Sequence, residues 1–391
     1  MRHILIFTGT RADWGILSPV ARALAARPDC RVTVAATNMH LSPRFGHTVD
    51  EIRADGFDPV AIPMDADADS DAARVAAMGA CMTGAAALIE SLRPDIAVIL
   101  GDRFEMLACA SACAMMRLPV AHIAGGEISE GAIDDAIRHA ITKLSSLHLT
   151  ATESYRLRVM ELGEDPALVI NTGALGVSNL RDLADPVSRG DLEAFAGLTI
   201  DRSTAIVTYH PATLDDAPVD SRVSALTDAL DETRRSLGLR FLFTYANNDA
   251  RGSRVNELLR SYVASAPAGS AAIVPSLGRR RYHSALRLVG AVIGNSSSGL
   301  VEVPSAGIPT VDIGVRQRGR IAGPSVIHCD DSSVAIARAV ARAFSPEMQA
   351  LAARCENPYY QPDSLACVVS AIAATPLERL RLKRFHDVLP L

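Results

Sequence analysis

The sequence predicts an α/β protein made of two doubly wound, Rossmann-like domains. Short apolar runs alternate with helix-like segments almost throughout the chain. These runs are apolar on both faces, as the strands of a parallel sheet are when helices cover both sides. The chain has 391 residues, which is long for one domain and comfortable for two. Two arrays of this kind imply two sheets, which we expect to face each other across a cleft.

The predicted strands and helices follow from these runs in chain order. The first half has strands at His3–Phe7, Val32–Ala36, Asp95–Leu100, Pro119–Ile123 and Leu147–Thr150. Helices are predicted between them at Trp14–Ala26, Ala72–Leu92, Glu105–Met116 and Ile133–Leu144. The second half has strands at Ala205–Tyr209, Phe241–Tyr245, Ala271–Val274, Val289–Ile293 and Thr310–Ile313, again with helices between them.

A polar segment, Ser178–Arg202, separates the two arrays and is broken by Pro186 and Gly190. We place the domain boundary there. The expected parts are an N-terminal Rossmann-like domain, a linker, a C-terminal Rossmann-like domain and a charged helical tail, at residues 1–178, 179–202, 203–374 and 375–391. The sequence leaves open whether the tail packs back on the first domain.

The composition disfavours several classes of function. The chain carries 39 basic and 44 acidic residues, a net charge of -5, whereas a nucleic-acid surface needs a basic face. Aromatic residues make up only 4%, so stacking platforms for single strands are not expected. No run approaches the ~20 apolar residues of a membrane span, and the first run is too short for a signal peptide. We therefore expect a cytoplasmic protein that binds neither nucleic acid nor membranes.

The sequence predicts no metal and no other cofactor. The seven cysteines show no metal-ligand spacing and are interpreted as small buried thiols, which suits a reducing compartment. The first strand is followed by Gly9, but the spaced glycines of a dinucleotide fingerprint are missing, so a nicotinamide cofactor is disfavoured.

Residues 294–320 are the most informative segment. An apolar run ends there in Gly-Asn-Ser-Ser-Ser-Gly, and a short helix can follow. Such a turn aims backbone N–H groups and hydroxyls at one point, which is a seat for phosphate. Glu302 lies one turn further on, where a carboxylate can bind both hydroxyls of a ribose, and Arg316 and Arg320 follow the next strand. Together they indicate a nucleoside diphosphate; the alternative is a solvated loop with a surface glutamate.

Residues that directly follow strands are the natural ligand contacts in such folds. Arg11 lies where a helix begins, an unfavourable place for a cation, so a bound diphosphate would explain it. An ion pair with Asp13 on the surface explains it equally well. Asp102 follows another predicted strand and is expected to face the cleft, although an aspartate there can also cap the next helix.

An acid-rich region follows the strand that ends at Ile123. Two adjacent glycines, Gly125 and Gly126, allow a close approach of the backbone to a ligand. The region then gathers acids, an arginine and a histidine, at Glu127, Glu130, Asp134, Asp135, Arg138 and His139. The alternative interpretation is structural: acids at the start of a helix form ordinary pairs with the arginine and the histidine one turn further on. Because of the double glycine, we favour a catalytic region.

Three features of the second half carry weaker indications. His210, followed by a proline, can bond a phosphate or transfer a proton. Asn247 and Asp249 follow another predicted strand and can line a sugar site. The basic run Arg279–Arg281 lies at a predicted helix start and is interpreted as a solvated turn.

Five motifs follow one another along the chain: Thr-Gly-Thr-Arg-Ala-Asp, Gly-Asp-Arg-Phe, His-Ile-Ala-Gly-Gly-Glu with Ile-Asp-Asp-Ala-Ile-Arg-His, His-Pro and Gly-Asn-Ser-Ser-Ser-Gly-Leu-Val-Glu. As an ordered set they resemble the motifs of the UDP-N-acetylglucosamine 2-epimerase family, most closely those of its hydrolysing branch. The resemblance runs from about residue 3 to about residue 374. It implies two Rossmann-like domains in the glycosyltransferase B arrangement, with the nucleotide in the cleft.

The resemblance also implies roles for single residues. Contacts to UDP are implied for Arg11, Asn295, Ser296, Ser297, Glu302 and Arg316. Catalytic roles are implied for Asp102, Asp134 and His210, and sugar-side or supporting roles for Arg103, Arg138, Asn247 and Asp249. Many family members carry a glutamate where this chain has Ala124, so the second acid/base role would move to Glu127 or Glu130. We count Glu127 among the catalytic candidates.

The implied reaction is the hydrolysing 2-epimerisation of UDP-N-acetylglucosamine, or of its 2,4-diacetamido-2,4,6-trideoxy analogue. A carboxylate takes the C-2 proton while the bond from C-1 to UDP breaks, and water then adds to the resulting glycal. The products are UDP and a free sugar of the N-acetylmannosamine type, a precursor for sialic or legionaminic acids. The alternatives are a non-hydrolysing epimerase, a glycosyltransferase of the same fold and a UDP-sugar sensor. We expect a homo-oligomer, either a dimer or a tetramer.

Overall fold

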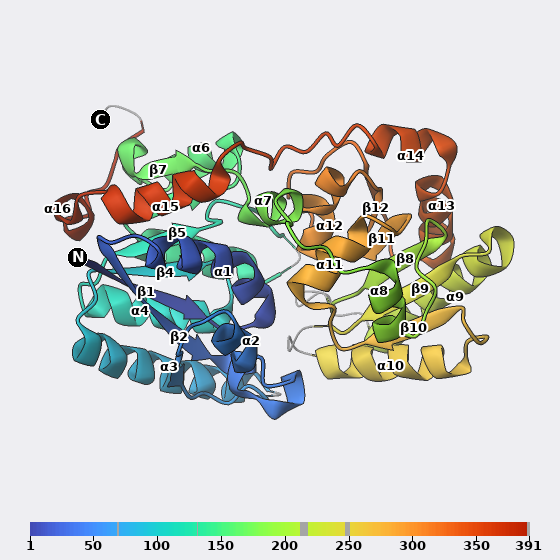
Figure 1. Cartoon of the computed structure of the whole chain (residues 1–391), viewed down its shortest axis with the longest axis horizontal. Helices are drawn as coiled ribbons and strands as arrows, with labels where there is room; N and C mark the ends of the chain where they lie inside the picture. The colour runs from blue at the N-terminus through green and yellow to red at the C-terminus, as the bar shows by residue number, and fades with distance from the viewer. Residues whose placement is uncertain (69, 131, 212–217, 247–250, 389–391) are drawn as a thin grey trace. The chain divides into compact units, whose positions relative to one another are not determined.

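The computed structural model describes residues 1–68, 70–130, 132–211, 218–246 and 251–388 of the chain. They form two compact units, each with its own parallel sheet (Figure 1). The first unit contains Met1–Glu127, Asp134–Ser178 and Gln361–Leu391, and the second contains Ile128–Ile133 and Asn179–Tyr360. The prediction of two doubly wound α/β domains is therefore confirmed.

The first unit has a seven-stranded sheet in the order β3-β2-β1-β4-β5-β6-β7. Its strands are β1 (Arg2–Thr8), β2 (Cys30–Thr37), β3 (Val60–Ile62), β4 (Ile96–Leu100), β5 (Val120–Ile123), β6 (Leu147–Thr150) and β7 (Val169–Asn171). The five predicted strands are present. The sequence missed β3 and β7, because three residues are too few to show a period.

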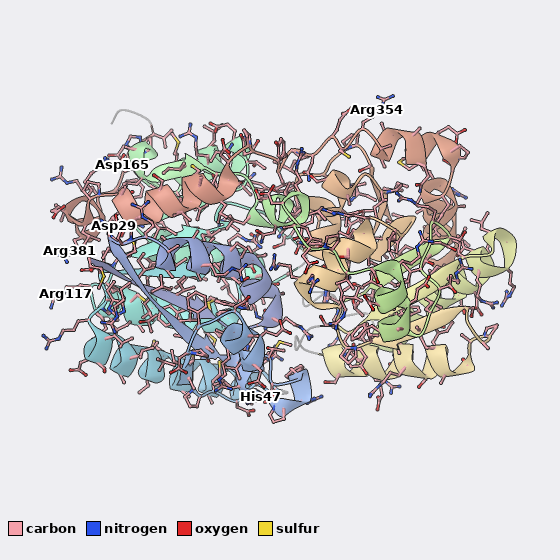
Figure 2. The ribbon with its side chains drawn as sticks, in the orientation of Figure 1. Asp29, His47, Arg117, Asp165, Arg354 and Arg381 are labelled. Carbon is pink, nitrogen blue, oxygen red and sulfur yellow. The ribbon has the colours of Figure 1, made fainter. Side chains whose placement is uncertain are left out.

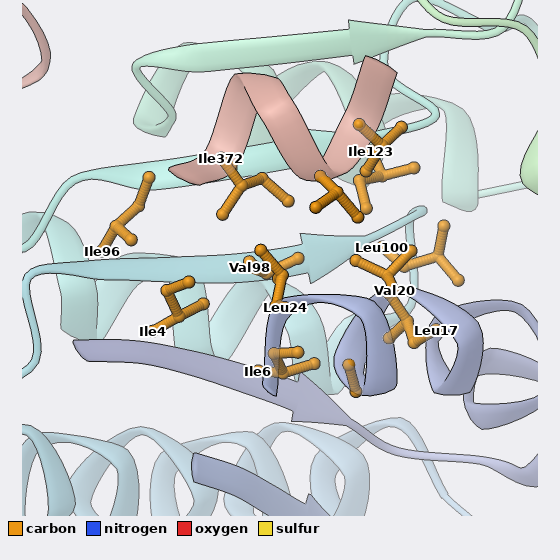
Figure 3. Close-up of a cluster of buried hydrophobic side chains, with 14 of the residues drawn as sticks. Ile4, Ile6, Leu17, Val20, Leu24, Ile96, Val98, Leu100, Ile123 and Ile372 are labelled. Atoms are coloured by element: carbon orange, nitrogen blue, oxygen red, sulfur yellow. The ribbon is translucent and has the colours of Figure 1, made fainter. Parts of the chain in front are cut away.

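Helices cover both faces of this sheet because successive strand residues point to opposite sides. Ile4 and Ile6 pack with Leu17 and Leu24 of α1 (Arg11–Ala25) and with Ile372, as Figure 3 shows. Leu5 and Phe7 pack on the other face, among residues of α3 (Asp71–Leu92) and α4 (Phe104–Met115). The remaining helices of this unit are α2 (Val49–Ala54), α5 (Asp134–Leu144), α6 (Glu153–Glu161), α15 (Ser364–Ala374) and α16 (Leu377–Arg381).

The C-terminal segment differs from the expected domain bounds. Residues 361–374, expected in the C-terminal domain, belong to the first unit because Val368 and Ile372 of α15 are buried in its core. The tail also packs on this unit, which answers the question that the sequence left open. Its helix α16 ends at Arg381, and the described residues after it continue without helical structure.

The second unit has a six-stranded parallel sheet in the order β10-β9-β8-β11-β12-β13. Its strands are β8 (Thr204–Thr208), β9 (Arg240–Thr244), β10 (Ala271–Val274), β11 (Ala291–Gly294), β12 (Thr310–Ile313) and β13 (Val326–Cys329). The sequence missed only β13, an edge strand that is only partly buried. The helices are α8 (Arg189–Ala196), α9 (Val219–Leu237), α10 (Gly252–Ser265), α11 (Gly278–Leu286), α12 (Ser297–Val301), α13 (Ser333–Ala343) and α14 (Pro346–Ala352).

The segment expected to be a linker, 179–202, is part of the second unit. Leu192 of α8 is fully buried, and Leu198 and Ile200 pack with it in the core on one face of the sheet. Pro186 and Gly190 lie before and within the start of α8 and do not mark a solvated connection. The chain passes from the first unit to the second within α7 (Leu175–Arg181).

One helix among the described residues, α3, is long and apolar enough by length and composition to cross a membrane. The prediction that no run approaches the length of a membrane span is therefore wrong for this segment. In the structure, α3 packs against α4 and buries Ala77, Cys81, Ala85 and Ile89 in the core of the first unit. Its N-cap is Ser70, whose hydroxyl accepts the Ala73 N–H, and its C-cap is Arg93, which has the left-handed conformation.

The strand order reverses once in each sheet, between β1 and β4 and between β8 and β11. At such a point the loops after the two strands diverge and leave room for a ligand. Gly9 and Asp102 follow the strands at the first reversal, and His210 and Asn295 follow those at the second. The topology therefore places most of the sequence-predicted residues at the carboxyl edges of the two sheets.

Candidate functional site

Arg138 is the centre of the candidate site in the first unit. Its side chain is 1% exposed, and a cation so deeply buried requires partners. Nη2 donates to the Asp102 carboxylate, and Nη1 donates to the backbone oxygen of Glu127 at 2.9 Å and to Oδ1 of Asp135 at 3.3 Å. Arg138 thus joins the ends of β4 and β5 to the first turn of α5.

Asp102 is paired with Arg138. The N-cap residue of helix α4 is Arg103, so the interpretation of Asp102 as the N-cap residue is wrong. The Asp102 side chain is 25% exposed and therefore remains accessible to a ligand. Asp134 is the first residue of α5 and is half-buried, whereas the Glu127 residue is only 6% exposed.

His122 supports the turn that carries Asp102, a role that was not predicted from the sequence. Burial lowers the pKa of His122 to about 3, so the ring is neutral. Its Nε2–H donates to the Gly101 oxygen at 2.7 Å, and Nδ1 lies 3.2 Å from the Thr142 hydroxyl of α5. A histidine inside a strand gives no periodic signal, which is why it was missed.

The double glycine packs tightly within its own unit, and the expected approach of a ligand stays a prediction. A Cβ on Gly126 would lie 2.4 Å from the Tyr155 backbone oxygen of α6, and one on Gly125 would lie 3.0 Å from His122 Nδ1. A side chain on Gly126 would clash with the Tyr155 backbone, and one on Gly125 would need a small shift of the His122 ring. Ala124, just before them, has a left-handed φ of 65°.

Gly9 likewise makes room for a buried acid and does more than permit a tight turn. A Cβ there would lie 2.3 Å from Oε1 of Glu105, a fully buried carboxylate. Arg103 Nε donates to the same Oε1 at 2.7 Å, and the Arg103 side chain is 13% exposed. Arg103 is therefore held beside the first strand reversal.

Arg11 does not pair with Asp13. Its Nη1 lies 3.8 Å from Oε1 of Glu51, while Asp13 accepts the Thr10 N–H at 3.0 Å in a capping box that begins α1. Burial raises the pKa of Asp13 to about 6, although the nearby Arg103 opposes the shift. The alternative is therefore wrong about the partner: Arg11 forms its ion pair with Glu51, whose side chain is 47% exposed, and not with Asp13.

In the second unit, Asn295 connects the ends of three strands. Its side-chain amide pairs with both backbone groups of His210, and its own carbonyl accepts Gln317 Nε2 at 2.9 Å and Arg316 Nη1 at 3.2 Å. Asn295 is 2% exposed. The β11 end reaches so close to Thr208 that a Cβ on Gly294 would lie 1.8 Å from the Thr208 oxygen.

Glu302 lies at the end of a chain of hydrogen bonds. Ser298 Oγ donates to Glu302 Oε2 at 2.5 Å, Tyr282 lies 2.7 Å from Ser298 Oγ, and His283 Nε2 lies 3.4 Å from Glu302 Oε1. Burial alone would raise the pKa of Glu302, but the bonds from His283 and Ser298 outweigh it, so the pKa lies below its ordinary value. Glu302 is therefore a buried carboxylate that stays ionised.

Tyr282 and His283 were missed because the basic run before them was interpreted as a solvated turn, although its place at a helix start was predicted. In the structure that run, Arg279–Arg281, lies in α11, whose other face buries His283. Ser296 is the N-cap of α12, and Ser297 is its first residue; both are half-buried. Pro304 ends the α-helical geometry, so Glu302 lies just after α12 rather than inside it.

Three sequence-predicted residues are placed elsewhere or not at all. Glu130 is exposed and belongs to the second unit, where its N–H donates to the Arg318 oxygen at 3.1 Å. Asn247 and Asp249 lie outside the described residues. Within the described ranges, no group of three or more His, Cys, Asp or Glu side chains has the geometry to hold a metal ion.

The chain is similar over most of its length to proteins of one family. A family model described as UDP-N-acetylglucosamine 2-epimerase matches residues 22–373. The chain is 35% identical over 326 residues to the GDP/UDP-N,N'-diacetylbacillosamine 2-epimerase (hydrolyzing) of Campylobacter jejuni, covering 83% of this chain and 84% of that protein. It is 32% identical over 373 residues to the polysialic acid biosynthesis protein P7 of Escherichia coli, covering 95% and 94%.

The fold is similar to that of a solved structure of the same kind. The UDP-GlcNAc 2-epimerase from Neisseria meningitidis, bound to UDP-GlcNAc, superposes with a TM-score of 0.81 at 16% sequence identity. The match covers 96% of this chain and 100% of that one. At this identity the likeness concerns the fold alone.

Proposed function

The chain belongs to the UDP-N-acetylglucosamine 2-epimerase family, and we propose that it is a hydrolysing UDP-sugar 2-epimerase. The observation that carries the proposal is the arrangement around Arg138, whose buried guanidinium holds the Asp102 carboxylate beside the start of α5. A carboxylate held in this way is suited to proton transfer at a substrate carbon. Two relatives are named as hydrolyzing 2-epimerases, from Campylobacter jejuni and Legionella pneumophila.

The first step of the proposed reaction is an elimination. One carboxylate, Asp102 or Asp134, takes the proton from C-2 of the sugar while the bond between C-1 and the UDP oxygen breaks. The electron pair of the C–H bond forms the double bond of a glycal, and UDP leaves with the electrons of the broken bond. Asp102 is suited to this role because it is both anchored by Arg138 and accessible.

The second step adds water to the glycal. The other acid delivers a proton to C-2 from the opposite face, and a water oxygen bonds to C-1 after losing a proton to a nearby base. The product is the free sugar with inverted configuration at C-2. Glu127 is the third carboxylate of this region in the proposal, since Ala124 stands where many relatives carry a glutamate.

The second unit is proposed to hold UDP and to stabilise its departure. Glu302 is ionised and fixed by Ser298 and His283, which suits a carboxylate that accepts bonds from a ribose diol. Ser296 and Ser297 at the start of α12 and the Arg316 guanidinium supply donors for the diphosphate. Asn295, His210 and Arg316 are connected, so the phosphate-side groups form one assembly. Arg11 and Arg103 are further proposed contacts of the substrate.

The substrate is a UDP-sugar with an acetamido group at C-2. Support for a 2,4-diacetamido-2,4,6-trideoxy sugar comes from the names of the two hydrolyzing relatives, and support for UDP-N-acetylglucosamine from the family description. The free product would feed the synthesis of sialic or legionaminic acids, in line with the name of the Escherichia coli relative. We place the enzyme in the cytoplasm, where UDP-sugars are made, as a dimer or tetramer.

One experiment tests the proposal. The protein is incubated in D₂O with each of the two UDP-sugars, and the products are followed by proton NMR. We expect free UDP together with the 2-epimerised sugar carrying deuterium at C-2. An epimer that still carries UDP would identify a non-hydrolysing enzyme, and an unchanged UDP-sugar would refute epimerase activity on that substrate.

A further inference from the structure

The C-terminal tail of the first unit places a lysine against the end of the helix that carries the candidate catalytic residues. Lys383 Nζ donates to the backbone oxygens of Lys143 and Ser145, each at 2.6 Å, and lies 3.4 Å from the Thr142 oxygen. These carbonyls belong to the last turn of α5 and the residue after it. Helix ends leave such carbonyls without partners in the helix, and a cation there also favours the helix dipole.

A buried acid fixes the lysine in this position. Glu164 Oε2 lies 2.8 Å from Lys383 Nζ and 3.0 Å from His148 Nε2, and Oε1 lies 2.6 Å from Lys143 Nζ. Burial alone would raise the pKa of Glu164, but these partners hold it at about 2. The Glu164 side chain is 3% exposed, so a buried negative charge holds Lys383 of the tail next to the carboxyl end of α5.

The residues after Lys383 continue the attachment. The His386 N–H donates to the Gly163 oxygen at 3.0 Å. The ring of Phe385 lies over Gly163, where a Cβ would approach the ring to 2.3 Å, and the Lys143 ammonium is 5.0 Å from the centre of the same ring. Lys383 is thus the central contact of a docked segment rather than an isolated surface cation.

The opposite end of α5 carries the candidate chemistry. The helix spans Asp134–Leu144, which corresponds to about 16 Å at the usual rise of an α-helix. Asp134 opens it, and Arg138 in its middle holds the Asp102 carboxylate. Because an α-helix of this length moves as a rigid rod, a shift at its carboxyl end displaces Asp134 and Arg138.

We propose that Lys383 is a positioning residue for the reaction, acting through α5. It fixes the carboxyl end of the helix and so sets the place of Asp134 and of the Asp102–Arg138 pair. This inference rests on the proposed function of those acids. It assigns the C-terminal tail a role in turnover that is separate from nucleotide binding.

The test replaces Lys383 by methionine, which keeps the apolar stem and removes every donor. We expect kcat for UDP release to fall about tenfold, since small misplacements of catalytic groups are costly, while KM and the Kd for UDP stay within about twofold. Lys383→Arg retains donors and should recover most of the activity. Arg381→Met is the matched control, because Arg381 is an exposed cation of the same tail (Figure 2) and should leave kcat unchanged.

Hydrogen exchange of the α5 amides provides a second readout. We expect faster exchange along α5 in Lys383→Met than in the wild type, and wild-type exchange in Lys383→Arg. A wild-type kcat in Lys383→Met would overturn the proposal, and so would an equal loss in Lys383→Arg or in Arg381→Met. A wild-type chain that converts neither UDP-sugar would instead refute the proposed function, so the two failures are distinguishable.

Discussion

The side-chain amide of Asn295 pairs with both backbone polar groups of His210. Its Oδ1 accepts the His210 N–H at 2.7 Å, and its Nδ2 donates to the His210 oxygen at 2.8 Å. The two residues are 85 positions apart in the sequence and follow neighbouring strands. Both side-chain groups of Asn295 are thereby engaged within the protein, so its part in nucleotide binding would be to fix the loops that carry other contacts.

Replacing Asn295 by alanine should weaken both folding and UDP binding. Two bonds to buried backbone groups are lost, which we expect to lower the free energy of unfolding by about 2–3 kcal/mol. UDP affinity should fall as well, because His210 loses the support of the Asn295 side chain. The bond from Arg316 goes to the Asn295 backbone oxygen and is retained in the variant. Urea unfolding and calorimetry with UDP measure the two effects. Asn256→Ala is the matched control: its amide pairs with Ala246 in the same manner, so its loss should affect stability alone.

Glu302→Ala should reduce the ability to distinguish UDP from 2'-deoxy-UDP. If the carboxylate binds the ribose diol, the wild type prefers UDP by about tenfold, since 2'-deoxy-UDP lacks one hydroxyl that donates to the charged carboxylate. The variant should bind both nucleotides equally and more weakly. Calorimetry with both nucleotides measures this, and a preference retained in Glu302→Ala would exclude the ribose role.

Asp102→Asn should abolish most UDP release from the substrate. A positioned acid or base contributes roughly 10²–10⁴-fold to the rate, and an amide beside Arg138 cannot exchange a proton. Asp135→Asn removes the same charge from another partner of Arg138 and should cost far less. Coupled assays of released UDP compare the two variants. Near-normal turnover in Asp102→Asn would remove Asp102 from the mechanism.

The pair of His328 and Asp312 should make folding stability depend on pH. His328 Nδ1 lies 2.8 Å from Asp312 Oδ2, and this bond raises the pKa of His328 above its ordinary value of 6.5. A raised pKa means that the stabilisation is fully present below the unfolded-state pKa and is lost as pH rises through the folded-state pKa. The effect should stay below about 1 kcal/mol because the histidine is half-exposed. The test is to measure the free energy of unfolding of the wild type and of His328→Gln at several pH values, from below 6.5 to above the folded-state pKa of His328.

Gly319 should tolerate a side chain less well than Gly314, although both have a left-handed φ. A Cβ on Gly319 would lie 2.4 Å from Cγ2 of Ile128, whereas one on Gly314 meets nothing nearer than 3.8 Å. We expect Gly314→Ala to cost about 1–2 kcal/mol from backbone strain, and Gly319→Ala to cost more. Adding Ile128→Ala should recover part of the difference. Urea unfolding of the single and double variants provides the comparison.

Much of the fold could be predicted because buried parallel strands are apolar on both faces, as β1 and β8 are. The strands that escaped prediction are short or partly exposed, such as β3 and β13. The linker and the last domain bound differed from the structure for another reason. Leu192 and Ile372 look like ordinary helix residues, and only the packing reveals which core they enter.

The candidate site was predictable to the extent that it lies directly after strands. Asp102, His210 and Asn295 were singled out on that ground, whereas His122, Tyr282 and His283 lie within a strand or a helix and were not. Their importance comes from contacts with Gly101, Ser298 and Glu302, which no local pattern encodes.

The sequence by itself determined two parallel sheets, the strand ends that meet at each sheet edge and the resemblance to one family. Local periodicity and turn chemistry suffice for this, because they act over a few neighbouring residues. Only the tertiary structure decided the partners: Arg138 binds Asp102 across 36 positions, and Lys383 reaches the end of α5 across 238 to 241. Such pairs depend on how whole helices and strands pack together. The packing brings buried charges into contact from segments whose local sequences do not indicate that they will meet.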